Sequence, residues 1–138
     1  MKIDIGVPNS MHVRAMVQPW EYALTGEDVC NAVALADRLG FYKCMLGEHF
    51  IVPNQHLDLS GAHYFHTAVA LGVFGGCTKK LRLAPSVTII GLQNPIVQAK
   101  AWSTLDLCLS LRNKKRRSFD FQAAHLVRSG GRLRQPGR

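Results

Sequence analysis

The segment between residues 32 and 50 constrains the fold of this chain more than any other. It starts with a helical pattern, exits through Gly40, and continues as a nearly unbroken apolar run from Phe41 to Gly47. A strand without polar alternation is typical of a parallel sheet that is covered on both faces. The run stops at Glu48 and His49, so two ionisable groups are expected at the carboxyl end of a parallel strand. Ligands and catalytic residues collect at that end in parallel α/β architectures.

Strand and helix patterns alternate along the first hundred residues. Thr25 and Asp28 form a capping-box pattern before the first helix, and Gly40 follows it as a stop signal. Asn94 and Pro95 give a start signal for the last helix. The expected strands are 3–8, 41–47 and 81–90, and the expected helices lie between 25 and 40, over 67–74 and over 96–109. This alternation predicts an α/β fold with a parallel sheet, either doubly wound or closed as a barrel.

Residues suited to binding follow each expected strand. Pro85 cannot donate a ladder hydrogen bond, so its place within the third apolar run predicts a bulge or a break beside Ser86. The residues at strand ends, loops or caps that we expect to face a site are Pro8, Asn9, Glu48, His49, Ser86, Val87 and Asn94.

The connection from Ile51 to His66 is longer than most loops between secondary-structure elements, which favours a binding loop. His63 and His66 have the spacing of a metal-ligand pair, but no third ligand stands at the expected distance. We therefore predict no metal site. His56 and Asp58 are interpreted as polar loop residues.

The basic character of the chain belongs to its last 32 residues. Residues 1–106 carry eight basic and eight acidic side chains, whereas residues 107–138 carry nine basic and one acidic. We divide the chain there into a body and a basic tail that lacks periodicity and is expected to be disordered, with a fourth strand near 118–121. The alternative function is a small nucleic-acid-binding module acting through Lys114–Arg117, although no aromatic residue within that cluster could stack a base. Nucleic acid is therefore not the favoured partner.

The four cysteines are widely spaced and lie in apolar patterns, which indicates buried, reduced thiols and a cytoplasmic protein. The longest apolar run, residues 68–77, is too short to span a bilayer, so we expect no membrane insertion.

Residues 1–106 resemble the luciferase-like flavin monooxygenase family, including its deazaflavin-dependent branch. Four blocks carry the resemblance in the order and spacing of the family: ADRLGF, GEHF, LRLAPSVTI and NPIVQAKAWSTLD. The family fold is a (β/α)8 TIM barrel of ~250 residues. The resemblance implies that this chain forms the N-terminal half of such a barrel, with three to four βα units.

The resemblance also implies a site. His49 would lie near the flavin ring as a general acid or base, a task that suits imidazole because it titrates near neutral pH. Glu48 would orient His49 or face a neighbouring loop. Ser86 and Val87 would contact the cofactor through a non-proline cis peptide. The implied cofactor is FMN or deazaflavin (coenzyme F-420), which acts on a small organic substrate by oxygenation or by hydride transfer.

The pattern of the family breaks after Asp106. This break and the charge jump at residue 107 motivate the hypothesis of a truncated family member, with a frameshift as one origin of the tail and no assurance that the chain is active alone. Self-association of two half-barrels is the competing hypothesis, because each half would cover the open strand edges of the other.

Overall fold

A computed structural model describes residues 1–110 of the chain. The predicted strand at 118–121 and the basic cluster at 114–117 lie outside the described residues. The strands are β1 (Asp4–Gly6), β2 (Lys43–Leu46) and β3 (Arg82–Pro85). The α-helices are α1 (Gly26–Leu39), α2 (Leu57–Ser60), α3 (Thr67–Cys77) and α4 (Pro95–Ser110), and three short 3-10 helices are η1 (Pro19–Ala23), η2 (Asn54–His56) and η3 (Ile90–Leu92).

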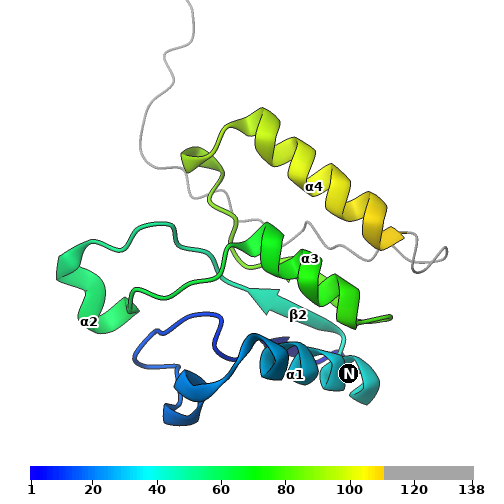
Figure 1. Cartoon of the computed structure of the whole chain (residues 1–138), viewed down its shortest axis with the longest axis horizontal. Coiled ribbons are helices and arrows are strands. Elements are labelled where there is room, and N and C mark those ends of the chain that lie inside the picture. The colour runs from blue at the N-terminus through cyan, green and yellow to red at the C-terminus, as the bar shows by residue number, and fades with distance from the viewer. Residues whose placement is uncertain (111–138) are drawn as a thin grey trace, which may run out of the picture.

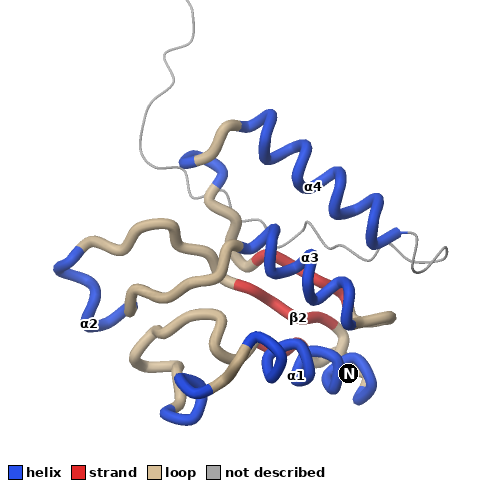
Figure 2. The backbone as a smooth tube through the Cα atoms, in the orientation of Figure 1, coloured by secondary structure: helices blue, strands red, loops and turns tan. Residues whose placement is uncertain are grey.

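The strands form a parallel sheet in the order β1-β2-β3, and helices connect them. Helix α1 links β1 to β2, α3 links β2 to β3, and α4 follows β3 (Figures 1 and 2). Helix α3 packs between α1 and α4 along the sheet (Figure 1). The predicted βαβαβα order and the parallel sheet are therefore confirmed.

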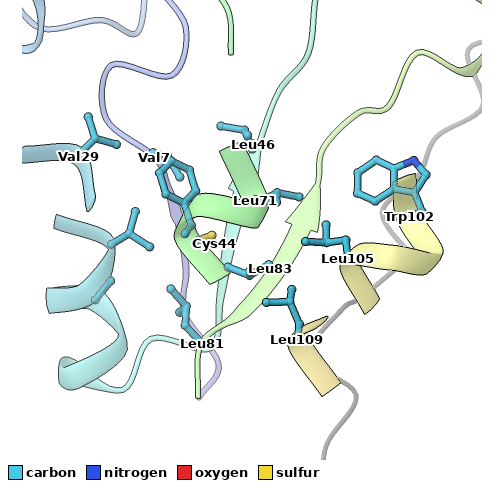
Figure 3. Close-up of a cluster of buried hydrophobic side chains, with 13 residues drawn as sticks. Val7, Val29, Cys44, Leu46, Leu71, Leu81, Leu83, Trp102, Leu105 and Leu109 are labelled. Atoms are coloured by element: carbon cyan, nitrogen blue, oxygen red, sulfur yellow. The ribbon is translucent and has the colours of Figure 1, made fainter. Parts of the chain in front are cut away.

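The core lies between the sheet and these helices (Figure 3). Cys44, Leu46 and Leu83 are at most 1% exposed and supply the sheet side of the core. The helices contribute, among others, Val29, Val33, Leu71, Phe74, Leu105 and Leu109. One register row across the three strands is polar. In it, Asp4 pairs with Lys43 at 3.2 Å and Lys43 lies in register with Arg82.

The capping prediction for α1 is confirmed. The Thr25 hydroxyl accepts the backbone N–H of Asp28 at 3.2 Å, and the Asp28 carboxylate accepts the N–H of Thr25 at 2.9 Å. The Thr25 hydroxyl also donates to the Asp28 carboxylate at 2.6 Å, and this bond, together with that from the backbone N–H of Thr25, lowers the pKa of Asp28. Gly40 ends the helix with a φ of 81°, a conformation that glycine adopts without strain.

Several predicted boundaries were wrong. The third strand ends at Pro85 instead of Ile90, because the chain leaves the sheet where proline lacks a backbone donor. Helix α3 runs through the glycines at 75 and 76, which we expected to end it, and stops at Cys77. Helix α4, in contrast, follows the predicted range of 96–109 closely, and Leu109 near its end is buried in the core. The cis peptide implied at Ser86 and Val87 is absent, as all described peptide bonds are trans.

The cysteines differ in exposure more than the sequence indicated. Cys44 is fully buried, and burial raises the pKa of its thiol to about 12. Cys30 and Cys77 are half-buried, whereas Cys108 is exposed. No helix among residues 1–110 is both long enough and apolar enough to cross a membrane.

Candidate functional site at the carboxyl ends of the strands

Glu48 lies directly after β2 and joins three parts of the chain. Its side chain is buried, with 4% exposed. One carboxylate oxygen accepts the backbone N–H of Thr67 at 3.1 Å, and the other accepts that of Ile89 at 3.0 Å. Thr67 is the first residue of α3, so the negative charge also stands at a helix N-terminus, where it is favourable. Glu48 thereby fixes the end of β2 against α3 and the segment after β3.

His49, the next residue, is exposed. Its ring packs edge-on against Tyr64, with 4.7 Å between the ring centroids. Among the described residues, the carboxylate of Glu48 bonds to Thr67 and Ile89 and not to His49. The sequence thus placed both residues correctly at the strand end, but their side chains have different surroundings.

Ser86 and Val87 leave the sheet beside the end of β2. The backbone N–H of Ser86 donates to the carbonyl of Leu46 at 2.8 Å, which holds the ends of β2 and β3 together. Ser86 is exposed and Val87 is half-buried. At the end of β1, a Cβ added to Gly6 would meet no atom within 4 Å, so the sheet edge is open there.

Asn9 has a left-handed backbone conformation with a φ of 55°. Its backbone N–H donates to the Glu21 carboxylate at 2.7 Å, and its side-chain amide donates to the carbonyl of Leu24 at 3.2 Å. Its side-chain oxygen accepts from His12 at 2.6 Å, and its carbonyl accepts from His63 at 2.9 Å. The polar groups of Asn9 therefore hold the loop after β1 in place.

An apolar cleft of about 350 Å³ lies beside Pro8 at the end of β1. Among the residues that line it are Met11, Met16, Trp20 and Glu21. Asn94 lies farther along the chain and is exposed. Its side-chain oxygen accepts the N–H of Ile96 at 2.9 Å, as a helix cap.

Sequence reasoning missed the meeting of His12 and His63. These rings stack at 4.2 Å between centroids, although 50 positions separate them in the sequence. Burial lowers the pKa of His12, the charge of His63 lowers it further, and Glu21 opposes both effects. No local signal announces such a contact, because it depends on how two loops fold over the strand ends.

The other histidine of the suggested metal pair has a different neighbour. His66 packs against Phe50, with 5.7 Å between ring centroids, while His63 stacks on His12. Residues 1–110 contain no group of three or more side chains arranged to hold a metal ion.

Two solved structures with the same arrangement of strands and helices are monooxygenases. The oxygenating constituent of 3,6-diketocamphane monooxygenase from Pseudomonas putida, a type II Baeyer-Villiger monooxygenase in complex with FMN, superposes with a TM-score of 0.61 at 14% identity. It covers 91% of this chain, and this chain covers 30% of it. Monooxygenase RslO1 from Streptomyces bottropensis gives a TM-score of 0.59 at 19% identity, with 88% of this chain and 32% of that one covered.

The chain thus spans about a third of the length of these structural relatives. At such low identity the likeness establishes the fold, a fragment of the TIM barrel. No curated protein sequence matches significantly. The model of one protein family does match, over residues 6–110, and that range includes all three strand ends described above. The chain therefore belongs to the luciferase-like monooxygenase family.

Proposed function

We propose that this chain supplies part of a flavin-dependent oxidoreductase site in which His49 exchanges a proton with a small organic substrate. The arrangement at the end of β2 carries the proposal. His49 is exposed, whereas Glu48 beside it is buried and held by two backbone amides. Glu48 is then a positioning residue, and the neighbouring imidazole is available for acid or base chemistry. Membership of the family supports this kind of reaction.

The described residues suit the ring system of a flavin or deazaflavin better than its phosphate. Open space above Gly6 and the exposed Ser86 leave room for a planar group at the strand ends. The three loops after the strands, residues 7–24, 47–66 and 86–94, contain a single arginine, Arg14, and no lysine. We therefore propose that Ser86 and Val87 contact the ring and that these loops do not bind the phosphate. Bound FMN would supply oxygen activation, and a deazaflavin would supply hydride transfer.

The cleft beside Pro8 favours an apolar substrate. Its wall consists mainly of Met, Val, Pro and Trp side chains, with the carboxylate of Glu21 engaged by Asn9 and Gln18. We propose that Pro8 contacts the substrate and that Asn9 holds the wall in place. Substrate contact by Asn94 stays a prediction, since its oxygen caps α4.

Fluorescence titration of the full 138-residue chain tests the proposal. We expect FMN and riboflavin to bind with similar affinity, because the loops offer no cationic cluster for the phosphate. His49→Gln should weaken binding or change the bound flavin spectrum. His56→Gln is the matched control, because His56 is exposed and its side chain bonds only to the Gln55 side chain among the described residues.

Three outcomes would count against the proposal. Absence of saturable binding by any flavin would overturn it for this chain. Binding of FMN but not riboflavin would overturn the assignment of the loops to the ring. Equal effects of His49→Gln and His56→Gln would remove His49 from the site.

A further inference from the structure

Two loops meet over the strand ends through a pair of half-buried histidines. His12 belongs to the loop after β1, and His63 belongs to the loop after β2. Their rings stack with 4.2 Å between centroids and an interplanar angle of 29°. The backbone N–H of His12 also donates to the carbonyl of His63 at 3.1 Å. The ring stack thus lies within the contact that holds the two loops together.

The hydrogen bonds of the pair define the tautomer of each ring. The Asn9 side-chain nitrogen donates to the carbonyl of Leu24, so its oxygen is the atom that faces His12. An amide oxygen only accepts, so Nε2 of His12 carries a proton. The carbonyl of Asn9 likewise requires a proton on Nε2 of His63. Both rings satisfy Asn9 while neutral, and neither needs a second proton on Nδ1.

The surroundings of the pair offer one negative charge. From η1, the Glu21 carboxylate and the ring of Tyr22 face His12, with 4.6 Å between the ring centroids of His12 and Tyr22. From the loop after β2, the ring of Phe65 packs on His63 with 5.3 Å between centroids and adds no charge. Glu21 already accepts the backbone N–H groups of Asn9 and Gln18. A proton on one ring has a counter-charge, but protons on both would place two cations face to face.

We propose that the His12–His63 pair is a pH-sensitive joint, which holds the loops after β1 and β2 together while at least one ring is neutral and releases them when both rings are protonated. The joint lies next to the candidate site. Met11, beside His12, forms an isolated antiparallel bridge with Tyr64, and the ring of Tyr64 packs against His49. Release of the joint therefore moves Tyr64 away from the exposed ring of His49.

The packing of the loops makes this response abrupt. A Cβ at Gly61 would overlap the carbonyl oxygen of His12, so the two backbones are in direct contact. Loops packed this closely separate as units, because a small gap between them already loses much of their contact energy. The lowered pKa of His12 agrees with a ring that resists protonation while the loops are closed.

Hydrogen exchange of the full chain between pH 8 and pH 5, corrected for the intrinsic rate, tests the proposal. Three backbone N–H groups report on the joint. The N–H of His12 donates to the carbonyl of His63, and the N–H of Arg14 donates to that of Leu59. The N–H of Phe65 donates to the carbonyl of Ser10. We expect them to lose protection at acidic pH while amides within α1 keep theirs. Loss of protection within α1 as well as at these three amides would mean global unfolding and would overturn the proposal of a local joint.

Two variants make the test specific to the pair. His63→Gln keeps a side-chain donor for the carbonyl of Asn9 but cannot gain a charge, so the loops should stay protected at acidic pH. NMR titration of the same variant should show that the pKa of His12 rises, because the charge of His63 is gone. His56→Gln, in the same loop but outside the contact, should behave as the parent chain. An unchanged pKa of His12, or equal acid sensitivity in all three proteins, would overturn the proposal.

Discussion

The two ends of the parallel sheet are connected in different ways. At the amino ends, residues 40–42 and 78–81 are short turns between a helix and a strand. At the carboxyl ends, residues 7–25, 47–66 and 86–94 form longer connections that contain five of the six histidines in the chain. This difference is expected for parallel α/β folds, in which the amino ends of the strands contribute stability and the carboxyl ends bind ligands.

However, each end of the sheet also contains one carboxylate with a structural role. At the amino end, Asp37 in α1 accepts the backbone N–H groups of Lys79, Lys80 and Leu81 at 2.6, 2.8 and 2.5 Å. At the carboxyl end, Glu48 accepts two backbone N–H groups from separate segments. Both carboxylates therefore connect parts of the chain that are distant in sequence, and the site end contains a structural element of its own.

The largest effect is expected for Glu48→Ala. The variant would leave the buried amides of Thr67 and Ile89 without an acceptor, at a cost of about 3 kcal/mol in the free energy of unfolding. Urea denaturation would measure it. Glu27→Ala, in an exposed position of α1, is the control. A loss below that of the control would mean that the site end contributes no stability through Glu48.

Asp37→Ala should cost somewhat less, about 2 kcal/mol, because water can reach the amides of Lys79 and Lys80 once the carboxylate is removed. The same denaturation experiment compares it with Asp106→Ala on the exposed side of α4. A larger loss of stability for Asp37→Ala than for Glu48→Ala would mean that burial of the carboxylate does not determine which of the two contributes more to the free energy of unfolding.

Two glycines with positive φ sharpen the comparison between the two ends. Gly61 in the site loop has a φ of 66° and no room for a Cβ, whereas Gly40 at the amino end has a φ of 81° and open space. Gly40→Ala should cost about 1 kcal/mol, from backbone strain alone. Gly61→Ala should cost about 2 kcal/mol, because overlap with His12 adds to the strain. Equal losses in the free energy of unfolding would indicate that the loops containing His12 and Gly61 move apart to accept the added Cβ at no cost.

The sequence predicted the layers of this fold better than its site. Apolar periodicity, the capping box at Thr25 and the stop at Gly40 are local signals, and each predicted its element correctly. The carboxyl end of β2 followed from the same pattern, so Glu48 and His49 could be located. Their neighbours could not be, because contacts such as that of Glu48 with Ile89 depend on which loops fold against one another.

Asn9 illustrates the same limit. Its position after the first strand indicated a binding role, but four hydrogen bonds, three of them to groups distant in the sequence, show how its polar atoms are used. The length of β3 was overestimated for a related reason. Apolar composition continues to Ile90, but the chain leaves the sheet at Pro85, and the N–H of Ile89 then bonds to Glu48.

The smallest effect is the dependence of stability on pH through His12. Burial, and next the charge of His63, lower the pKa of His12 in the folded chain, against about 6.5 for an unfolded imidazole. The unfolded state therefore binds the proton more readily. The contribution is complete above about pH 6.5, declines as the pH falls below that value, and is lost once the pH passes the folded pKa. Urea denaturation at a series of pH values should show a shallower decline for His12→Gln than for the parent chain or His56→Gln. Identical slopes would mean that the site loops fold over one another without any electrostatic cost at acidic pH, and the contrast between the two ends of the sheet would then rest on packing alone.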